Sequence, residues 1–250
     1  NALIGNSETA AGLEMTALGP KIEFLENTKI AITGANLGPL IDGDSVDQWT
    51  AISVEKGSEL TFSGPVEGLR SWLAVLGGID VPLVMGSRST YTKAGIGGFQ
   101  GRELRSGDVI YSYGEPGAAT VRPMCIEPEN IPIYGSPQII RVILGPQHTS
   151  FESHGIDTFL TSEYSVSLDS DRMGYRLEGP PVNHIDGPDL ISDGNACGSI
   201  QIPGNGQPII LLSDRGTSGG YTKIATVITS DLGKVAQTMP GDVLIFEKVD

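Results

Sequence analysis

Two arginines and an aspartate near the middle of the chain have the spacing of an anion-binding site. Arg172 and Arg176 lie four residues apart, Asp171 precedes the first of them, and Gly174 lies between them. Glycine permits backbone conformations that other residues resist, and a guanidinium group presents donors that match two oxygens of a carboxylate, a carbamate or a phosphate. Residues 162–179 are therefore predicted to hold a planar anion. The alternative is a surface network of aspartate and arginine that fixes a tight strand corner.

Polar, glycine-rich stretches occur in both halves of the chain. When hydroxyl groups and an arginine lie beside them, the backbone N–H groups of such loops can form a cradle for an oxyanion or a phosphate. None has the spacing of a Walker P-loop, and ordinary hairpin turns are the competing interpretation. The stretches are 77–80, 85–91, 95–98, 201–208 and 213–221.

Several classes of chemistry are disfavoured by what the sequence lacks. There is no Gly-x-Ser-x-Gly elbow for a serine hydrolase. His148, His154 and His184 have no metal-ligand spacing, so no metal site is predicted. Paired carboxylates remain available, and the best placed are Glu163, Asp171 and Asp214, although sequence alone does not pair them.

Net charge and cysteine content limit the classes of partner and the cellular compartment that we expect. A formal net charge of -14 argues against a nucleic-acid or anionic-membrane partner. Cys125 and Cys197 are too few for a disulfide framework, which is typical of a reducing compartment. No apolar run is long enough to span a membrane and no secretory signal is visible, so we expect a cytoplasmic protein. The chain begins at Asn1, and we expect part of the first subdomain to precede it.

The elements that must position these residues are mostly strands. The chain's 34 glycines and 16 prolines favour many turns over long helices. Helices are predicted over residues 150–160, with Phe151, Gly155 and Phe159 on one face, and after a Ser230 cap through Gln237. Strands are predicted at 29–33, 59–63, 70–75, 141–144, 209–213, 222–228 and 243–246.

Short sequence repeats in the same order indicate two related halves. We therefore predict a first β-rich half over residues 1–122, a linker over 123–139 and a second β-rich half over 140–250. Because ligands often bind where two such units meet, the expected cleft lies between them. The repeats pair 18–20 with 144–146, 31–34 and 41–43 with 176–179 and 185–187, and 106–110 with 240–244.

Longer motifs make the sequence resemble the biotin-dependent carboxyltransferase A/B family. Members of the family include KipA, the 5-oxoprolinase component called PxpC, the proteins labelled allophanate hydrolase subunit 2, and the carboxyltransferase region of urea carboxylase. The resemblance covers nearly the whole chain. It rests on residues 77–82, 86–91, 162–164, 170–179, 198–203, 206–209 and 219–227.

The resemblance implies a mostly β fold of two cyclophilin-like barrels with a few short helices. It implies a catalytic component of a heteromeric, ATP-hydrolysing 5-oxoprolinase that opens 5-oxoproline to glutamate with a KipI/PxpB-like subunit and a third, PxpA-like subunit. ATP would be used together with these partners. One alternative is a biotin-dependent carboxyltransferase acting on urea or a related amide, with biotin carried by another chain. Another is a KipA-like regulatory protein that binds a KipI-type kinase inhibitor.

The resemblance also assigns roles to residues. Arg172 and Arg176 would hold an anionic group, Asp171 would orient them, and Asp214 completes the catalytic set. The expected substrate-binding residues are Ser87, Arg88, Ser89, Glu163, Tyr164, Gly174, Tyr175, Gln201, Gln207, Gly219, Gly220, Tyr221 and Lys223.

Four features depart from the family's pattern or are missing. Gly216 stands where the family commonly has glutamine, and Thr222 stands where it has proline, which leaves the finer substrate contacts open. There is also no biotin-attachment motif and no ATP-grasp domain, so any ATP or biotin chemistry must draw on other chains or an unfamiliar site.

Overall fold

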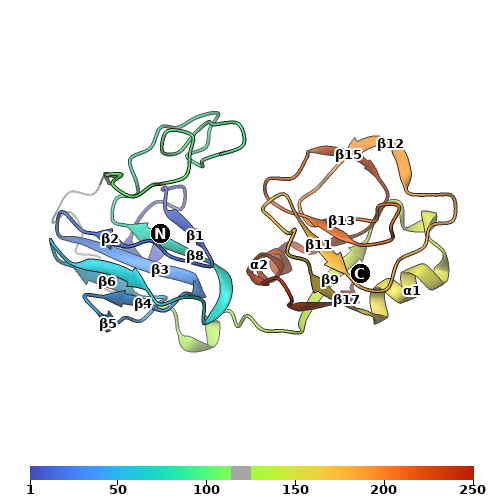
Figure 1. Ribbon diagram of the computed structural model, residues 1–250, viewed down its shortest axis with the longest axis horizontal. Coiled ribbons are helices and arrows are strands. Elements are labelled where there is room, and N and C mark those ends of the chain that lie inside the picture. Colours follow the sequence, from blue (N-terminus) through green and yellow to red (C-terminus); the bar gives the residue numbers. More distant parts are fainter. Residues whose placement is uncertain (114–124) are drawn as a thin grey trace. The chain divides into compact units, whose positions relative to one another are not determined.

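The computed structural model describes residues 1–113 and 125–250, and these divide into two compact units (Figure 1). Unit 1 is Asn1–Ile133 and unit 2 is Tyr134–Asp250. The predicted boundary between residues 122 and 123 lies outside the described residues. The regular structure is mostly β with a few short helices, as predicted, and every segment predicted as a strand overlaps an observed one. In the described ranges, no helix combines the length and apolar character needed to cross a bilayer.

Unit 1 is built from two antiparallel sheets. Its strands are β1 (Leu13–Thr16), β2 (Ile22–Glu23), β3 (Thr28–Asn36), β4 (Pro39–Ile41), β5 (Asp44–Ser45), β6 (Ala51–Val54), β7 (Glu59–Phe62) and β8 (Glu67–Val75), with 3-10 turns η1 (Ala2–Ile4) and η2 (Pro128–Asn130). The strand orders are β1-β8-β3-β6 and β2-β7-β4-β5. Side chains from both sheets share one apolar cluster, which holds the sheets together.

Strand β3 explains why this unit has a continuous apolar run at its centre. Ile30 and Ile32 enter the main cluster with Leu60 from the other sheet. Ala31, between them, packs with Ala74 in a second cluster. Because successive side chains of a strand point to opposite faces, burying both faces of β3 requires apolar residues at consecutive positions.

Unit 2 contains a closed barrel with the strand order β10-β11-β14-β13-β16-β9-β17. The β17–β9 pair is parallel and the other neighbours are antiparallel. Two further strands, β12 and β15, form a separate ribbon. The elements are β9 (Gln138–Leu144), η3 (His148–Ser150), α1 (Ser153–Thr161), β10 (Glu163–Val166), β11 (Gly174–Glu178), β12 (Asp189–Gly194), β13 (Ser199–Gln201), β14 (Ile209–Leu211), β15 (Ser218–Tyr221), β16 (Lys223–Val227), η4 (Thr229–Asp231), α2 (Leu232–Gln237) and β17 (Val243–Lys248).

Aromatic side chains fill the barrel beside α1. Phe159 of α1 stacks on Phe246 of β17 with ring centroids 4.4 Å apart, and Tyr164 of β10 lies 5.9 Å from Phe246. The predicted helix at residues 150–160 therefore exists but begins at Ser153, so that Phe151 is buried just before it.

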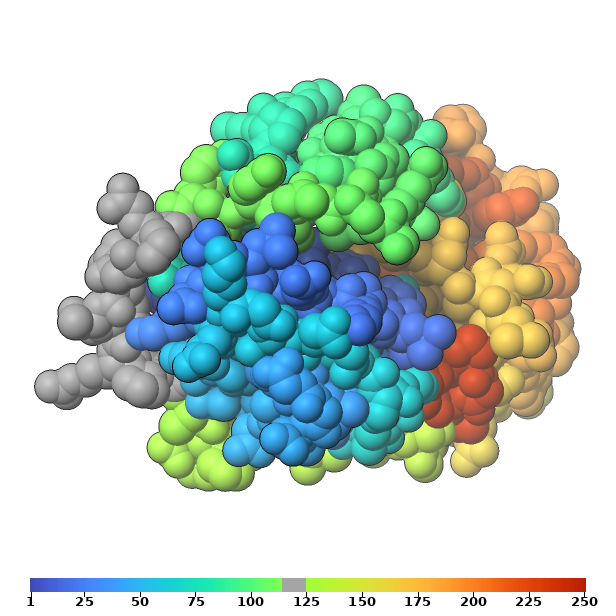
Figure 2. All heavy atoms as spheres, turned by 60° about the vertical axis from the view of Figure 1, so that its left-hand side comes forward, coloured from blue at the N-terminus to red at the C-terminus, as the bar shows by residue number. Residues whose placement is uncertain are grey.

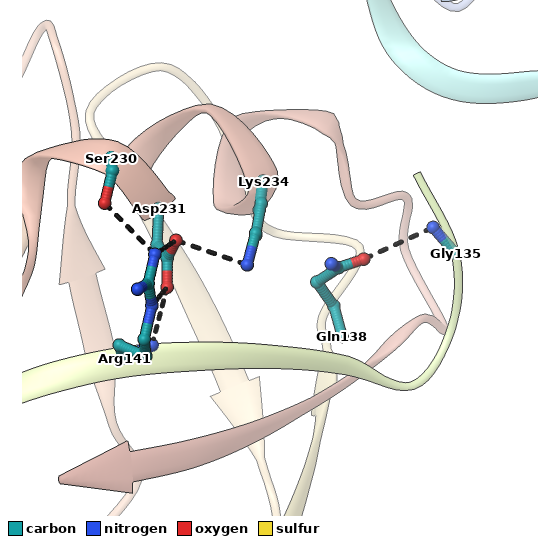
Figure 3. Close-up of polar contacts among 6 residues, drawn as sticks. All are labelled: Gly135, Gln138, Arg141, Ser230, Asp231 and Lys234. Carbon is teal, nitrogen blue, oxygen red and sulfur yellow. Dashed lines mark hydrogen bonds and ion pairs between the residues drawn. The ribbon is translucent and has the colours of Figure 1, made fainter. Parts of the chain in front are cut away.

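A buried carboxylate ties the second helix to the barrel (Figure 3). Asp231 has no exposed side-chain surface, and its oxygens accept hydrogen bonds from the Arg141 Nη2 and Nε atoms at 2.7 and 2.9 Å and from the Lys234 Nζ atom at 3.2 Å. The hydrogen bond from Arg141 holds the pKa of Asp231 well below its usual range, although burial opposes this shift. The prediction that Ser230 caps the helix is wrong. The 3-10 turn η4 precedes α2, and the Ser230 hydroxyl accepts from Arg141 instead.

One of the repeated motifs folds identically in both units. In unit 1, Asp108 donates its N–H to the Arg105 carbonyl at 3.0 Å and accepts the Arg105 N–H at 2.7 Å. In unit 2, Asp242 makes the same pair of bonds with Met239 at 3.0 and 2.7 Å. The glycine before each aspartate has a φ near +90°, which favours glycine at this position. The sequence repeat thus corresponds to a structural repeat.

Candidate functional site

The aspartate–arginine stretch forms a turn between β10 and β11. The Asp171 carboxylate accepts the backbone N–H groups of Met173 and Gly174 at 2.8 and 3.3 Å. Ser170 closes the turn on Arg176, because its hydroxyl accepts the Arg176 N–H at 3.1 Å and donates to the Arg176 carbonyl at 3.3 Å. Asp171 therefore shapes the backbone that carries Arg172.

Arg172 and Asp214 are brought together across two loops at one end of the barrel. The Arg172 Nε atom donates to the Asp214 carboxylate at 3.2 Å, and the Asp214 N–H donates to the Arg172 carbonyl at 2.9 Å. The Arg172 side chain is 44% exposed, and an ion pair of this exposure contributes little stability. The contacts described for Arg176 are made by its backbone, and its side chain is exposed on β11. The structure thus pairs one of the two arginines with a predicted acid.

Two of the predicted substrate-binding tyrosines lie in the core. Tyr164 is fully buried, its hydroxyl donates to the Pro180 carbonyl at 3.1 Å, and burial raises its pKa to about 12. Tyr175 is 1% exposed and its hydroxyl donates to the carbonyls of Ala236 and Thr238. Both side chains are satisfied internally, so neither is assigned to substrate binding.

Three other predicted residues have structural or exposed positions. The Gln207 carboxamide makes two bonds to the backbone of Gly179, at 2.9 and 3.0 Å, and thereby fastens two loops together. A Cβ atom at Gly174 would lie 3.0 Å from the Ile210 carbonyl oxygen, so this glycine permits close strand approach. Glu163 is exposed on β10.

A buried polar cluster lies at β13 and β16, beside the β12–β15 ribbon. It consists of Asn195, Gln201 and Lys223, which are 8%, 6% and 3% exposed. The Gln201 amide donates to the Asn195 carbonyl oxygen at 3.3 Å, and Asn195 donates to the Gly216 carbonyl at 3.1 Å. The Lys223 ammonium lies 3.3 Å from the carboxylate of Asp193 on the ribbon. Burial of an ammonium group is costly without such a partner.

Glycines of the ribbon leave room for this cluster. A Cβ atom at Gly219 would lie 2.9 Å from the Asn195 amide nitrogen and 3.0 Å from that of Gln201. One at Gly220 would lie 3.1 Å from the Leu190 carbonyl oxygen. Tyr221, which ends the ribbon strand, is 42% exposed. Gln201, Gly219, Gly220 and Lys223 were all predicted as site residues, and the structure brings them together.

Thr222 has its own place beside the cluster. Its hydroxyl lies 2.9 Å from the His184 Nε2 atom, and its N–H donates to the Pro188 carbonyl at 3.0 Å. A proline at this position would remove that donor. Burial lowers the pKa of His184, which favours the neutral ring. The threonine therefore fixes the loop under the ribbon by contacts that a proline could not make.

The predicted residues of unit 1 lie in a glycine-rich segment that follows β8. Figure 2 shows residues 77–113 as a green cap beside the blue amino-terminal strands. Arg88 donates from Nη1 to the Val81 carbonyl, and its guanidinium lies 5.7 Å from the centre of the Tyr113 ring. The Ser89 N–H donates to the Ser87 hydroxyl at 3.1 Å. That these residues contact the same ligand as unit 2 stays a prediction.

The chemistry of the polar cluster is that of amide and anion recognition. A carboxamide offers a donor and an acceptor side by side, which complements an amide. An ammonium group complements a carboxylate or a developing oxyanion. Among the described residues, no group of three or more His, Cys, Asp or Glu is arranged to hold a metal ion.

The sequence of nearly the whole chain matches a known family. The family described as "Carboxyltransferase domain, subdomain A and B" matches residues 1–248. The chain belongs to this family. The C-type subunit of the Escherichia coli K12 5-oxoprolinase is 38% identical over 98% of this chain and 77% of its own length. The urea amidolyase of Saccharomyces cerevisiae is 33% identical over 98% of this chain and 14% of its own length.

A solved structure agrees with this membership. The K. lactis urea amidolyase superposes on 100% of this carboxyltransferase-family chain with a TM-score of 0.93 and 29% identity. This chain corresponds to 16% of that larger protein. The cyclophilin-like fold implied by the resemblance is supported, most directly by the closed barrel of unit 2.

Some site residues were missed from the sequence. Asn195 and Asp193 precede a short strand with no distinctive motif, and only the fold brings them to Gln201 and Lys223. Arg215 was also missed, and its Nε atom donates to the Asn195 carbonyl at 2.9 Å. A usable signal was present at Arg215, since it adjoins the predicted Asp214 in a glycine-rich stretch.

Proposed function

We propose that this chain is the C-type component of a multi-subunit, ATP-dependent 5-oxoprolinase. The observation that carries the proposal is the 38% identity to the C-type subunit of the E. coli 5-oxoprolinase, which extends over 77% of that protein. The reaction adds water across the lactam C–N bond of 5-oxoproline and gives glutamate. A KipI/PxpB-like subunit and a PxpA-like subunit would complete the enzyme, and ATP would be used with these partners.

In this proposal the buried polar cluster recognises the lactam. Gln201 and Asn195 would pair with the lactam amide, and the Lys223 ammonium would face the carbonyl oxygen, where negative charge develops during attack. Access requires the β12–β15 ribbon to move. Its strands are mostly exposed and lie outside the barrel, so displacing them disrupts little buried surface.

The Arg172–Asp214 pair would hold an anionic group of the substrate or of a phosphorylated intermediate. Arg172 suits this role because a guanidinium presents a planar fork of donors that matches two oxygens of an anion. Asp171 acts through the turn backbone and is therefore a positioning residue. Arg176 remains a second candidate for anion binding because its side chain is exposed.

The second candidate function is a biotin-dependent carboxyltransferase acting on urea or a related amide. The superposition on the K. lactis urea amidolyase over 100% of this chain favours it. Biotin would be carried by another chain, and the same carboxamide groups would complement urea, which is itself an amide.

The experiment is ATP-dependent glutamate release from 5-oxoproline by the full-length protein assembled with its two partner subunits. Gly219→Ala should lower turnover about tenfold or more, because the methyl group displaces the Asn195 and Gln201 amides, and each lost amide contact is worth about a factor of ten. Gly216→Ala is the matched control, since its Cβ atom would come no closer than 3.4 Å to the Ser218 carbonyl oxygen. Arg172→Ala should also remove most of the activity.

Assembly and thermal melting of each variant separate loss of function from loss of fold. An assembled, folded wild-type complex that releases no glutamate contradicts the oxoprolinase proposal. Carboxylation of urea with a biotin carrier domain is then the next assay. Equal turnover by the Gly219→Ala and Gly216→Ala complexes would remove the polar cluster from the proposed site.

A further inference from the structure

Unit 1 contains a pocket that the proposed function does not use. Its volume is about 410 Å³, and it lies between residues 80–82 and the glycine-rich run 97–101. This volume is in the range of small-molecule sites. Every lining residue belongs to unit 1, so the pocket is defined without reference to the other unit.

One part of the lining is a run of backbone N–H groups. Gly97, Gly98, Gln100 and Gly101 have φ values of +71°, +49°, +56° and +67°. Residues 98–101 are in turn conformation, and successive backbone N–H groups of a turn can form a concave site for an anion. Among the described residues, no backbone acceptor is found for the N–H groups of residues 97–100. In the proposal below, these groups are the donors to the ligand.

Packing requires glycine at two of these positions. A Cβ atom at Gly97 would lie 2.3 Å from the Ser89 carbonyl oxygen, and one at Gly98 would lie 1.7 Å from the Thr90 hydroxyl. The segment 85–91 therefore packs directly against the glycine-rich run 97–101. This close contact explains why the glycines of 95–98 and the hydroxyl residues of 85–91 occur together in the sequence.

The other part of the lining carries a carboxylate. Asp80 interacts with the Tyr113 hydroxyl, and this interaction raises the pKa of Tyr113. Arg88 interacts with the same hydroxyl and donates to the carbonyl of Val81, the next residue of the lining. Asp80 is thus held by the Tyr113 hydroxyl, which lies outside the pocket lining and also interacts with Arg88.

We propose that this pocket binds a small zwitterion of the α-amino-acid class, with its carboxylate on the N–H groups of residues 97–100 and its ammonium group on Asp80. A simple dicarboxylate fits less well because Asp80 repels it, and the chain already has a net charge of -14. A lactam fits less well because its nitrogen is uncharged. Glutamate is a natural probe if the proposed function holds, but the zwitterion class does not depend on that function.

The test is titration of the full-length chain with L-glutamate, followed by calorimetry and by the backbone amide signals of residues 95–101 in NMR spectra. Glutarate lacks the ammonium group, and 5-oxoproline replaces it with a neutral lactam nitrogen. Both should bind about tenfold more weakly than glutamate, since each loses one charge-assisted hydrogen bond. The amide signals of the glycine run should shift with glutamate.

A matched pair of variants tests the location. At Gly95, which lines the pocket, and at Gly86, which does not, an added Cβ atom meets nothing within 4 Å, and the φ values are +66° and +78°. Asparagine tolerates this conformation better than most residues. Gly95→Asn should weaken glutamate binding about tenfold by obstructing the pocket, whereas Gly86→Asn should not. Asp80→Asn should weaken glutamate binding and strengthen glutarate binding.

Two results would overturn the proposal. One is the absence of glutamate binding to the folded wild-type chain at about 10 mM. That concentration would detect even a site with a dissociation constant of about 1 mM. The other is binding that Gly95→Asn and Asp80→Asn both leave unchanged, which would place the ligand elsewhere. Turnover by the assembled complex is a separate readout. If the proposed function is wrong, the assembled complex shows no turnover, but the chain still binds glutamate.

Discussion

The two units share a pair of antiparallel strands and an aspartate turn, and they differ in the segment that connects the strands to the turn. In unit 1, β1 pairs antiparallel with β8, and in unit 2, β9 pairs antiparallel with β16. After β8 and after β16 the chain travels to the same aspartate turn, at 105–108 in unit 1 and at 239–242 in unit 2. The strand after the second turn, β17, closes the barrel. Its counterpart at 111–113 bonds instead to residues 78–80.

The connection itself is short in one unit and long in the other. Residues 228–238 of unit 2 fold into η4 and α2, and the buried Asp231 fixes them to β9. Residues 76–104 of unit 1 contain no helix, and their glycines have left-handed conformations, including those that line the pocket. If the proposed zwitterion site exists, one copy of the connection serves stability and the other serves binding.

The strongest test of this difference is Asp231→Ala. Removing this carboxylate leaves Arg141 and Lys234 without their buried partner, and unfolding free energy should fall by about 3 kcal/mol. Urea unfolding measures the loss, and hydrogen exchange should locate it in peptides from 229–248. Ser230→Ala, which removes only one exposed contact to Arg141, should change stability by less than about 0.5 kcal/mol. Equal effects of the two variants would contradict a stabilising role for the connection.

The sequence predicted the framework well because strand pairing leaves local signals. Segments such as 29–33 and 243–246 are apolar runs bounded by turn residues, and both became strands. The repeat at 106–110 and 240–244 correctly marked equivalent turns. The family resemblance supplied the cyclophilin-like fold. It also supplied the membership of the carboxyltransferase family, which the comparisons confirmed.

Side-chain direction was less predictable. Tyr164 and Tyr175 lie in a polar motif, but strand alternation turns both inward, and no local pattern reports which face is the core. Asn195 lacks any motif of its own, and the motif at 77–82 does not indicate that Asp80 interacts with Tyr113, because such partners are brought together only by the fold. Ser230 was misread as a cap because it lies inside the 3-10 turn that precedes α2, where its hydroxyl accepts from Arg141.

The equivalence of the two turns gives a prediction of intermediate size. Gly107 and Gly241 have φ values of +89° and +91°, and an added Cβ atom meets nothing within 4 Å at either. Alanine at each position therefore suffers only the strain of a left-handed backbone, which is about 1 kcal/mol. Urea unfolding of Gly107→Ala and Gly241→Ala should give equal losses within error. A clear inequality would show that the turns have different structural roles despite their shared geometry.

The smallest effect is the response of the unit 1 turn aspartate to acid. Asp108 forms two further bonds with Arg102, at 2.7 and 2.8 Å, and these lower its pKa to about 2 from an ordinary value near 4. Because the folded pKa is lower than the unfolded one, the stabilisation from Asp108 is present above about pH 4 and is lost as the pH falls toward 2. Asparagine keeps the acceptor for the turn but abolishes the charge. Melting temperatures between about pH 6 and 2.5 should therefore show a flatter acid limb for Asp108→Asn than for wild type. An acid limb that Asp108→Asn leaves as steep as that of wild type would contradict this contribution of the Arg102 pair. Arg102 also lies 5.1 Å over the ring of Phe99, which lines the unit 1 pocket, so the same variant tests whether the pair anchors the pocket to the turn.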